Sequence, residues 1–137
     1  MKSGETTNQI RTVNVETACA PIRGHYSHAS ELPNGVIYLS GQKAWTEGKS
    51  GPIVGNILEQ THVVFDHLEA ILRGLKLELS NVTRLVCYLR CEADYAGFDQ
   101  VYAERLKDHK PARAVVTGVQ LRDDAAVEIV ADAFRTL

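Results

Sequence analysis

The chain has 137 residues, 45% of them hydrophobic and 23% charged, and its 15 Lys and Arg against 17 Asp and Glu give a net charge of -2. This composition predicts one compact domain over residues 1–137 and excludes a disordered, collagen-like or disulfide-stapled chain. Neither an apolar run long enough to cross a bilayer nor a hydrophobic leader is present, so we expect a cytoplasmic protein without a membrane partner.

The basic residues and the cysteines exclude two further classes of protein. Lys and Arg are scattered and form no basic run with interleaved aromatics, so nucleic acid is not an expected partner. Cys19, Cys87 and Cys91 are odd in number and form no C-x-x-C pair, so we expect reduced thiols. Cys87 fits a small core residue, whereas the sequence assigns no redox role to Cys91.

Polar residues dominate the first dozen positions, and we expect residues 1–12 to be flexible. The first clear element is a β-branched and aromatic run over 36–39, which turn residues bracket on both sides. This run predicts a short buried strand. A glycine-rich loop over 48–55 follows it.

Residues 56–73 carry apolar side chains at steps of three and four, which predicts an amphipathic helix. Asn56 and Glu59 have the spacing of a capping box at its start. Gly74 stands where a left-handed C-terminal cap is usual.

A second strand is predicted over 82–89 and a second helix over 95–106. Two further strands, over 114–121 and 126–134, are separated by a short polar turn and are expected to form a hairpin. This order of elements predicts an α+β sandwich, with both helices on one face of a largely antiparallel or mixed sheet.

Two charged residues occupy positions in the last strands where apolar side chains are usual. Arg113 precedes one strand and Glu128 interrupts the other, and both could simply be solvated side chains at strand ends. In a flat hairpin, Glu128 would lie opposite about Val119, roughly 20 Å along the strand from Arg113. Only a sharp bend or a second subunit could then bring the two to one ligand. Together they would suit a carboxylate substrate, because Arg binds carboxylates bidentately and Glu can hold or deprotonate a water.

The histidines and glycines predict no metal and no nucleotide cofactor. His25 and His28 are three apart in an extended segment, and His62 and His67 are five apart on the helix, so neither pair shares a face. No H-E-x-x-H motif, Cys/His cluster or phosphate-binding glycine loop is present.

Five short motifs together carry a family resemblance that reaches from about Ala20 to Ala133. They are, in order, Gly24-His25-Tyr26-Ser27, then 36–39 followed by Ser40-Gly41-Gln42, then Gln60-Thr61, Pro111-Ala112-Arg113 and Val127-Glu128-Ile129. In this order and spacing the chain resembles the RidA/YjgF family of enamine and imine deaminases. The resemblance implies a chorismate-mutase-like α+β fold and a homotrimer around a sheet-lined barrel, with the sites in clefts between subunits.

The resemblance also implies roles for individual residues. Arg113 matches the carboxylate anchor and Glu128 the residue that positions water, and these two are the implied catalytic pair. The implied substrate-binding residues are Tyr26, Ser40, Gly41, Asp99 and Val115. The implied reaction needs no cofactor: an enamine such as 2-aminoacrylate tautomerises to an imine, which water hydrolyses to a 2-keto acid and ammonia.

The chain departs from the family pattern around this implied cleft. His25 stands where Pro is common, Ala114 and Val115 where Ser, Thr or Cys is common, and Asp99 and His67 replace Asn residues. Asp99 would repel an anionic substrate unless it is neutralised. These changes leave the substrate open.

Three alternatives therefore remain beside 2-aminoacrylate-like deamination. The chain could act on another enamine or imine, such as an aminomuconate or 3-aminoacrylate type. It could be a non-catalytic trimer that binds keto acids or a protein partner, since a fold does not guarantee turnover. Retention of Glu128 favours catalysis over binding alone. A ribonuclease role, attached to some relatives, is least favoured because the chain has no basic face.

Overall fold

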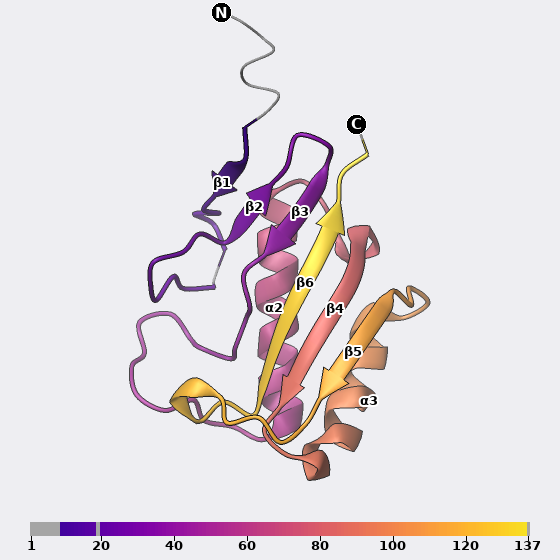
Figure 1. The fold of residues 1–137 in the computed structure, drawn as a ribbon. Coiled ribbons are helices and arrows are strands. Elements are labelled where there is room, and N and C mark those ends of the chain that lie inside the picture. The colour runs from indigo at the N-terminus through magenta and orange to yellow at the C-terminus, as the bar shows by residue number, and fades with distance from the viewer. Residues whose placement is uncertain (1–8, 19, 137) are drawn as a thin grey trace, which may run out of the picture.

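The computed structural model describes residues 9–18 and 20–136, which form a six-stranded mixed sheet with two α-helices on one face (Figure 1). The strand order is β1-β2-β3-β6-β4-β5. The strands are β1 (Arg11–Val13), β2 (Ala29–Glu31), β3 (Val36–Leu39), β4 (Val82–Leu89), β5 (Ala112–Val116) and β6 (Val127–Phe134). The helices are α2 (Ile57–Gly74), α3 (Tyr95–Leu106) and three short 3-10 turns, η1 (Leu79–Asn81), η2 (Glu92–Asp94) and η3 (Arg122–Asp124). The predicted α+β sandwich is therefore confirmed.

The predicted hairpin between the last two strands is wrong. β5 pairs in parallel with β4, and β6 lies antiparallel between β3 and β4, so β5 and β6 are not neighbours. The helix α3 connects β4 to β5, and such a crossover makes a parallel pair. Alternate residues of β6, among them Val127, Ile129 and Ala131, are fully buried and form the face that packs against the helices.

The helix α2 begins as its sequence predicts. Asn56 Oδ1 accepts the Glu59 backbone N–H at 2.8 Å, and Glu59 Oε1 accepts the Asn56 N–H at 2.8 Å. Its end differs from the prediction, because Gly74 is the last helical residue and the left-handed residue is Lys76, with φ 63°. Glycine suits position 74 for another reason, because a Cβ there would overlap Val15.

One face of the sheet packs against α2 and α3, and neither helix covers the other face (Figure 1). Burial alternates along β6, so that its even-numbered residues point to this open face. The open face is largely apolar at its centre, where Val86 pairs with Val130. Tyr38, Val116 and Phe134 on the same face are 46%, 42% and 40% exposed. A single chain thus presents an apolar sheet surface to solvent.

The predictions for the N-terminal segment and for the cysteines are confirmed only in part. Residues 1–8 and Cys19 lie outside the described residues, whereas Arg11 and Thr12, placed by sequence in a flexible segment, belong to β1. Cys87 is buried, as predicted, and Cys91 is partly exposed. No helix within residues 9–18 and 20–136 is long and apolar enough to cross a membrane.

Candidate active site

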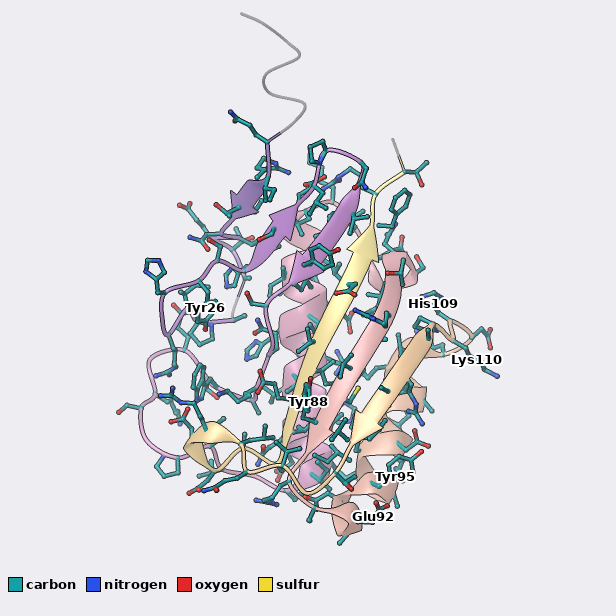
Figure 2. The ribbon with its side chains drawn as sticks, viewed as in Figure 1. Tyr26, Tyr88, Glu92, Tyr95, His109 and Lys110 are labelled. Carbon is teal, nitrogen blue, oxygen red and sulfur yellow. The ribbon has the colours of Figure 1, made fainter. Side chains whose placement is uncertain are left out.

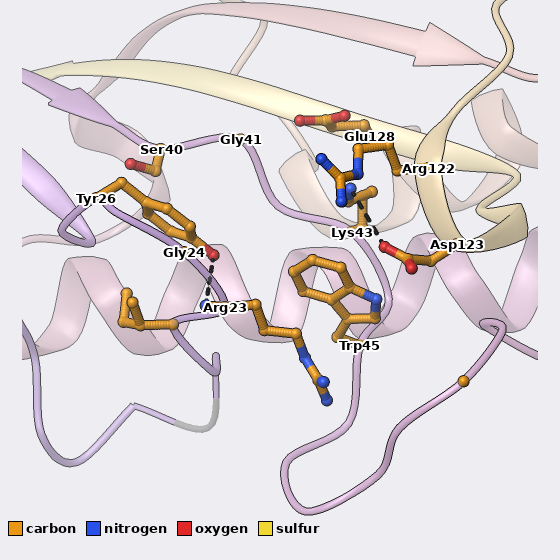
Figure 3. A pocket seen from close by; sticks show the side chains of 12 residues that line it. Arg23, Gly24, Tyr26, Ser40, Gly41, Lys43, Trp45, Arg122, Asp123 and Glu128 are labelled. Carbon is orange, nitrogen blue, oxygen red and sulfur yellow. Dashed lines mark hydrogen bonds and ion pairs between the residues drawn. The ribbon is translucent and has the colours of Figure 1, made fainter.

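A cavity of about 790 Å³ opens beside the end of β3, on the side of the sheet away from the helices (Figure 3). Four residues that the sequence analysis assigned to a site line it: Tyr26, Ser40, Gly41 and Glu128. The remaining lining residues are Ile22, Arg23, Gly24, Lys43, Trp45, Gly51, Arg122 and Asp123.

Glu128 and Gly41 are in direct contact in the lining of this cavity. A two-way bridge joins their neighbours, with the Gln42 N–H donating to Ile129 O at 2.9 Å and the Ile129 N–H donating to Gln42 O at 3.0 Å. The bridge brings the Glu128 carboxylate so close to Gly41 that a Cβ there would overlap Oε2. Glycine at position 41 is therefore required for the carboxylate to keep this place.

Tyr26 and Ser40 form the wall beside Gly41 (Figure 3). The Tyr26 hydroxyl accepts the Arg23 N–H at 3.1 Å, which leaves its own proton for donation into the cavity. The Ser40 hydroxyl donates to Ser27 O at 2.6 Å, and the Ser40 N–H donates to His28 O at 2.9 Å. These two hydrogen bonds fix the backbone at Ser40, where the chain leaves β3 and begins to line the cavity.

Basic residues that the sequence analysis did not single out line the same cavity as Glu128. The Trp45 ring lies 4.9 Å from Arg23 Cζ and 4.5 Å from Lys43 Nζ, and Lys43 lies 3.9 Å from the Asp123 carboxylate. Arg122 approaches the same space from η3 (Figure 3). The sequence could have indicated Lys43, because it is two residues from Gly41 in an extended segment and therefore points to the same side of the backbone.

Arg113 belongs to a second group, at the edge of the sheet beside α3. Its Nη1 donates to Asp99 Oδ1 at 2.7 Å and its Nη2 to the Tyr95 hydroxyl at 2.9 Å. Its guanidinium carbon lies 4.7 Å from the centroid of the Tyr102 ring. Burial opposes its charge, but the hydrogen bond and charge of Asp99 outweigh burial and raise the pKa of Arg113. Asp99 is thus the partner that neutralises the predicted anchor.

These two groups lie on opposite faces of the sheet within one chain. Arg113 pairs with the buried Leu85 and so points toward the helices, whereas Glu128 pairs with Tyr88 and points to the open face. They are two strands apart, about 10 Å, and three residues apart along the strands, about another 10 Å. The sequence-based register, with Glu128 opposite Val119, is wrong because no hairpin forms.

The other predicted binding residue, Val115, pairs with Cys87 and shares the face of Arg113. Figure 2 shows the same division, with Tyr26 and Tyr95 at opposite sides of the molecule. One chain therefore brings four of the seven predicted site residues together in the cavity and places the other three, Arg113, Asp99 and Val115, at the β5 edge.

Burial perturbs three other titratable side chains near these sites. Burial raises the pKa of Cys87 to about 12, and burial likewise raises the pKa of Tyr102 to about 12. Burial lowers the pKa of His67, whose Nε2 donates to Trp45 O at 2.6 Å. Within the part of the chain that the structure describes, no three His, Cys, Asp or Glu side chains are grouped to hold a metal ion.

Comparisons with known proteins give the chain a family. Residues 16–135 match the family described as Endoribonuclease L-PSP. A RutC family protein of Pyrococcus horikoshii is 36% identical over 88% of this chain and 94% of its own length. This chain belongs to the RidA/YjgF family. Its RidA/YjgF fold is also that of yeast Mmf1, whose crystal structure superposes with a TM-score of 0.84 at 28% identity, covering 93% of this chain and all of that one.

RidA/YjgF relatives carry names that point to more than one activity. The relative named 3-aminoacrylate deaminase RutC, from Acinetobacter baylyi, is 34% identical over 76% of this chain and 82% of its own length. It supports a deaminase-type role at the level of the family. The description of the matched family names an endoribonuclease instead.

Proposed function

We propose that the protein hydrolyses enamines or imines that carry a carboxylate, releasing a 2-keto acid and ammonia without a cofactor. In the simplest case 2-aminoacrylate tautomerises to 2-iminopropanoate, and one water then converts this imine to pyruvate and ammonia. The observation that carries the proposal is the carboxylate of Glu128, held against Gly41 in an open cavity. A side chain in this place can take a proton from water as the water adds to the C=N carbon.

Other side chains of the cavity can assist Glu128. Lys43 and Arg122 line the same cavity and present N–H donors to the carboxylate of a bound substrate. The Tyr26 hydroxyl can donate to the carboxylate of the substrate. Because such imines already hydrolyse in water, positioning and modest electrostatic help would be sufficient.

We infer that the carboxylate anchor in this cavity is Arg113 of a second copy of the chain. Within one chain Arg113 points to the opposite face from Glu128, so a complete site needs a neighbour. The apolar open face, centred on Val86 and Val130, supports association, because a sheet surface of this kind is normally covered. The assembly we propose is a homotrimer, with three such faces lining a barrel and a site between each pair of chains.

A test with several enamines and imines would identify the preferred substrate. The relative named 3-aminoacrylate deaminase makes 3-aminoacrylate the second substrate to try beside 2-aminoacrylate. An amino-acid oxidase acting on alanine supplies 2-iminopropanoate in place, whereas 3-aminoacrylate carries its nitrogen on C3 and has to be supplied separately. Ammonia release is followed with and without the protein. We expect acceleration with the wild type and its loss in both Glu128→Gln and Arg113→Ala.

A matched control separates catalysis from general damage. Glu104→Gln removes another carboxylate, 53% exposed on α3, and should leave activity unchanged. No acceleration with any imine, together with measurable keto-acid binding, would replace the proposal by a non-catalytic binding module. Cleavage of RNA that Glu128→Gln abolishes would replace it by the ribonuclease activity that the family description names.

A further inference from the structure

The ion pair of Asp99 and Arg113 changes what the anchor can bind. Asp99 Oδ1 lies 2.7 Å from Arg113 Nη1, and the two side chains are 42% and 28% exposed. The positive charge of Arg113 is thus already compensated inside the chain. A lone carboxylate that approaches this arginine also meets the negative charge of Asp99, which weakens its binding.

The geometry of the pair leaves hydrogen-bonding groups of both kinds free. A guanidinium has five N–H donors, and the bonds to Asp99 and Tyr95 use two, so about three remain. Oδ2 of Asp99 accepts no hydrogen bond from the residues that the structure describes. The pair therefore presents donors and a charged acceptor next to each other.

Aromatic rings hold this arrangement in place. The Arg113 guanidinium lies 4.7 Å from the Tyr102 ring centroid and 6.0 Å from that of Tyr95, and the Tyr95 hydroxyl accepts from Nη2. Tyr102 is 8% exposed and Tyr95 packs against the core, so neither ring is free to move away. The guanidinium and the carboxylate are thus preorganised, which favours a ligand of matching charge pattern.

We propose that Arg113 and Asp99 together bind a zwitterion, with its carboxylate on the free N–H groups of Arg113 and its protonated nitrogen on Oδ2 of Asp99. This inference rests on the proposed function, in which Arg113 is the anchor. The protonated imine of an amino acid is such a zwitterion, and it is the form that water attacks most readily. The 2-keto acid product lacks the positive nitrogen, so the same pair would favour its release.

Two ligands with the same carbon chain, one with an ammonium group and the other with a carbonyl at C2, test the proposal. 2-Aminobutanoate is a zwitterion at pH 7.5 and 2-oxobutanoate is a monoanion, and their affinities are measured by isothermal titration calorimetry. We expect the wild type to bind 2-aminobutanoate about tenfold more tightly. Asp99→Asn keeps the size of the side chain but removes its charge, and it should reverse this preference.

Two further variants act as controls for folding and for charge. Asp99→Glu retains the charge and should retain most of the preference for the zwitterion. Asp66→Asn alters the carboxylate that pairs with Arg105 at 2.7 Å on another helix surface, and it should change neither affinity.

The outcomes separate this inference from the proposed function. Equal or tighter binding of 2-oxobutanoate by the wild type, or an unchanged ratio in Asp99→Asn, overturns the zwitterion inference. Arg113→Ala tests the anchor itself, because both affinities should fall together. If neither ligand depends on Arg113, the proposed function loses its anchor as well.

Discussion

The carboxylate of Glu128 rests against the α-carbon of Gly41, with no room for a methyl group between them. The contact links two segments that are far apart in sequence, and the bridge between Gln42 and Ile129 fixes it. Gly41 is not in a left-handed conformation, so its need for glycine is steric and comes from this one neighbour. The place of the proposed water-holding group therefore depends on a residue that carries no functional group.

Gly41→Ala should displace the Glu128 carboxylate and lower kcat/KM for imine hydrolysis by about tenfold or more, because small misplacements of a catalytic group are costly. Thermal unfolding should change little, since Glu128 can turn toward the open cavity. The double variant with Glu128→Gln is the control. If Gly41→Ala acts only through this carboxylate, the double variant is no slower than Glu128→Gln alone. A further loss in the double variant would contradict the steric explanation.

The open face gives a prediction about assembly. Val86→Glu puts a charge at the centre of this face, where it would be buried without a partner in a trimer but solvated in a single chain. In sedimentation experiments we expect the wild type to have the mass of three chains and Val86→Glu to dissociate and lose activity. Val54→Glu is the control, because Val54 is 84% exposed in a loop. A monomeric wild type, or a trimeric Val86→Glu variant, would contradict the intersubunit site.

Local patterns were sufficient to predict the helices and most of the strands. The periodicity of α2 and its Asn56 capping box depend on residues close in sequence, and both are confirmed. The alternation along β6 correctly separated its buried side chains from Glu128. Each of these features is set by near neighbours, which sequence reasoning reads directly.

The pairing of distant segments was not predicted from local pattern. β6 pairs with both β3 and β4, and β5 pairs in parallel with β4 after the α3 crossover. This pairing of the strands places Arg113 on the opposite face of the sheet from Glu128. Lys43 reaches the cavity from the segment after β3 and Arg122 from η3, so only the assembled sheet brings both into the cavity that Glu128 lines.

Gly74 gives a prediction about stability. Replacing a glycine inside a helix by alanine usually stabilises the helix by up to about 1 kcal/mol. Here the added methyl group would overlap Val15, so we expect Gly74→Ala to lower the free energy of unfolding by about 1 to 3 kcal/mol. Urea unfolding monitored by circular dichroism measures this change. The destabilisation should shrink in a Val15→Ala background, and an equal loss in both backgrounds would contradict the steric cause.

Glu31 gives a prediction about pH. Its carboxylate accepts from Arg135 Nε at 2.7 Å and from Arg11 Nη2 at 2.5 Å, and its side chain is 12% exposed. The hydrogen bond from Arg135, which outweighs the opposing effect of burial, and a second from Arg11 lower the pKa of Glu31. A carboxyl group with a lowered pKa stabilises the folded protein above its unfolded pKa of about 4.3, and this contribution is lost as the pH falls through the lower folded value.

We therefore expect Glu31→Gln to lower the free energy of unfolding by about 1 to 2 kcal/mol at pH 7, because it replaces a charge-assisted hydrogen bond by a neutral one. The difference from the wild type should shrink steadily below about pH 4.3, where the unfolded chain takes up the proton. Urea unfolding between pH 3 and pH 7 measures both values. Glu47→Gln, at an exposed loop position, should show no such dependence. A difference for Glu31→Gln that stays constant across this range would mean that the ionised carboxylate contributes nothing beyond its shape.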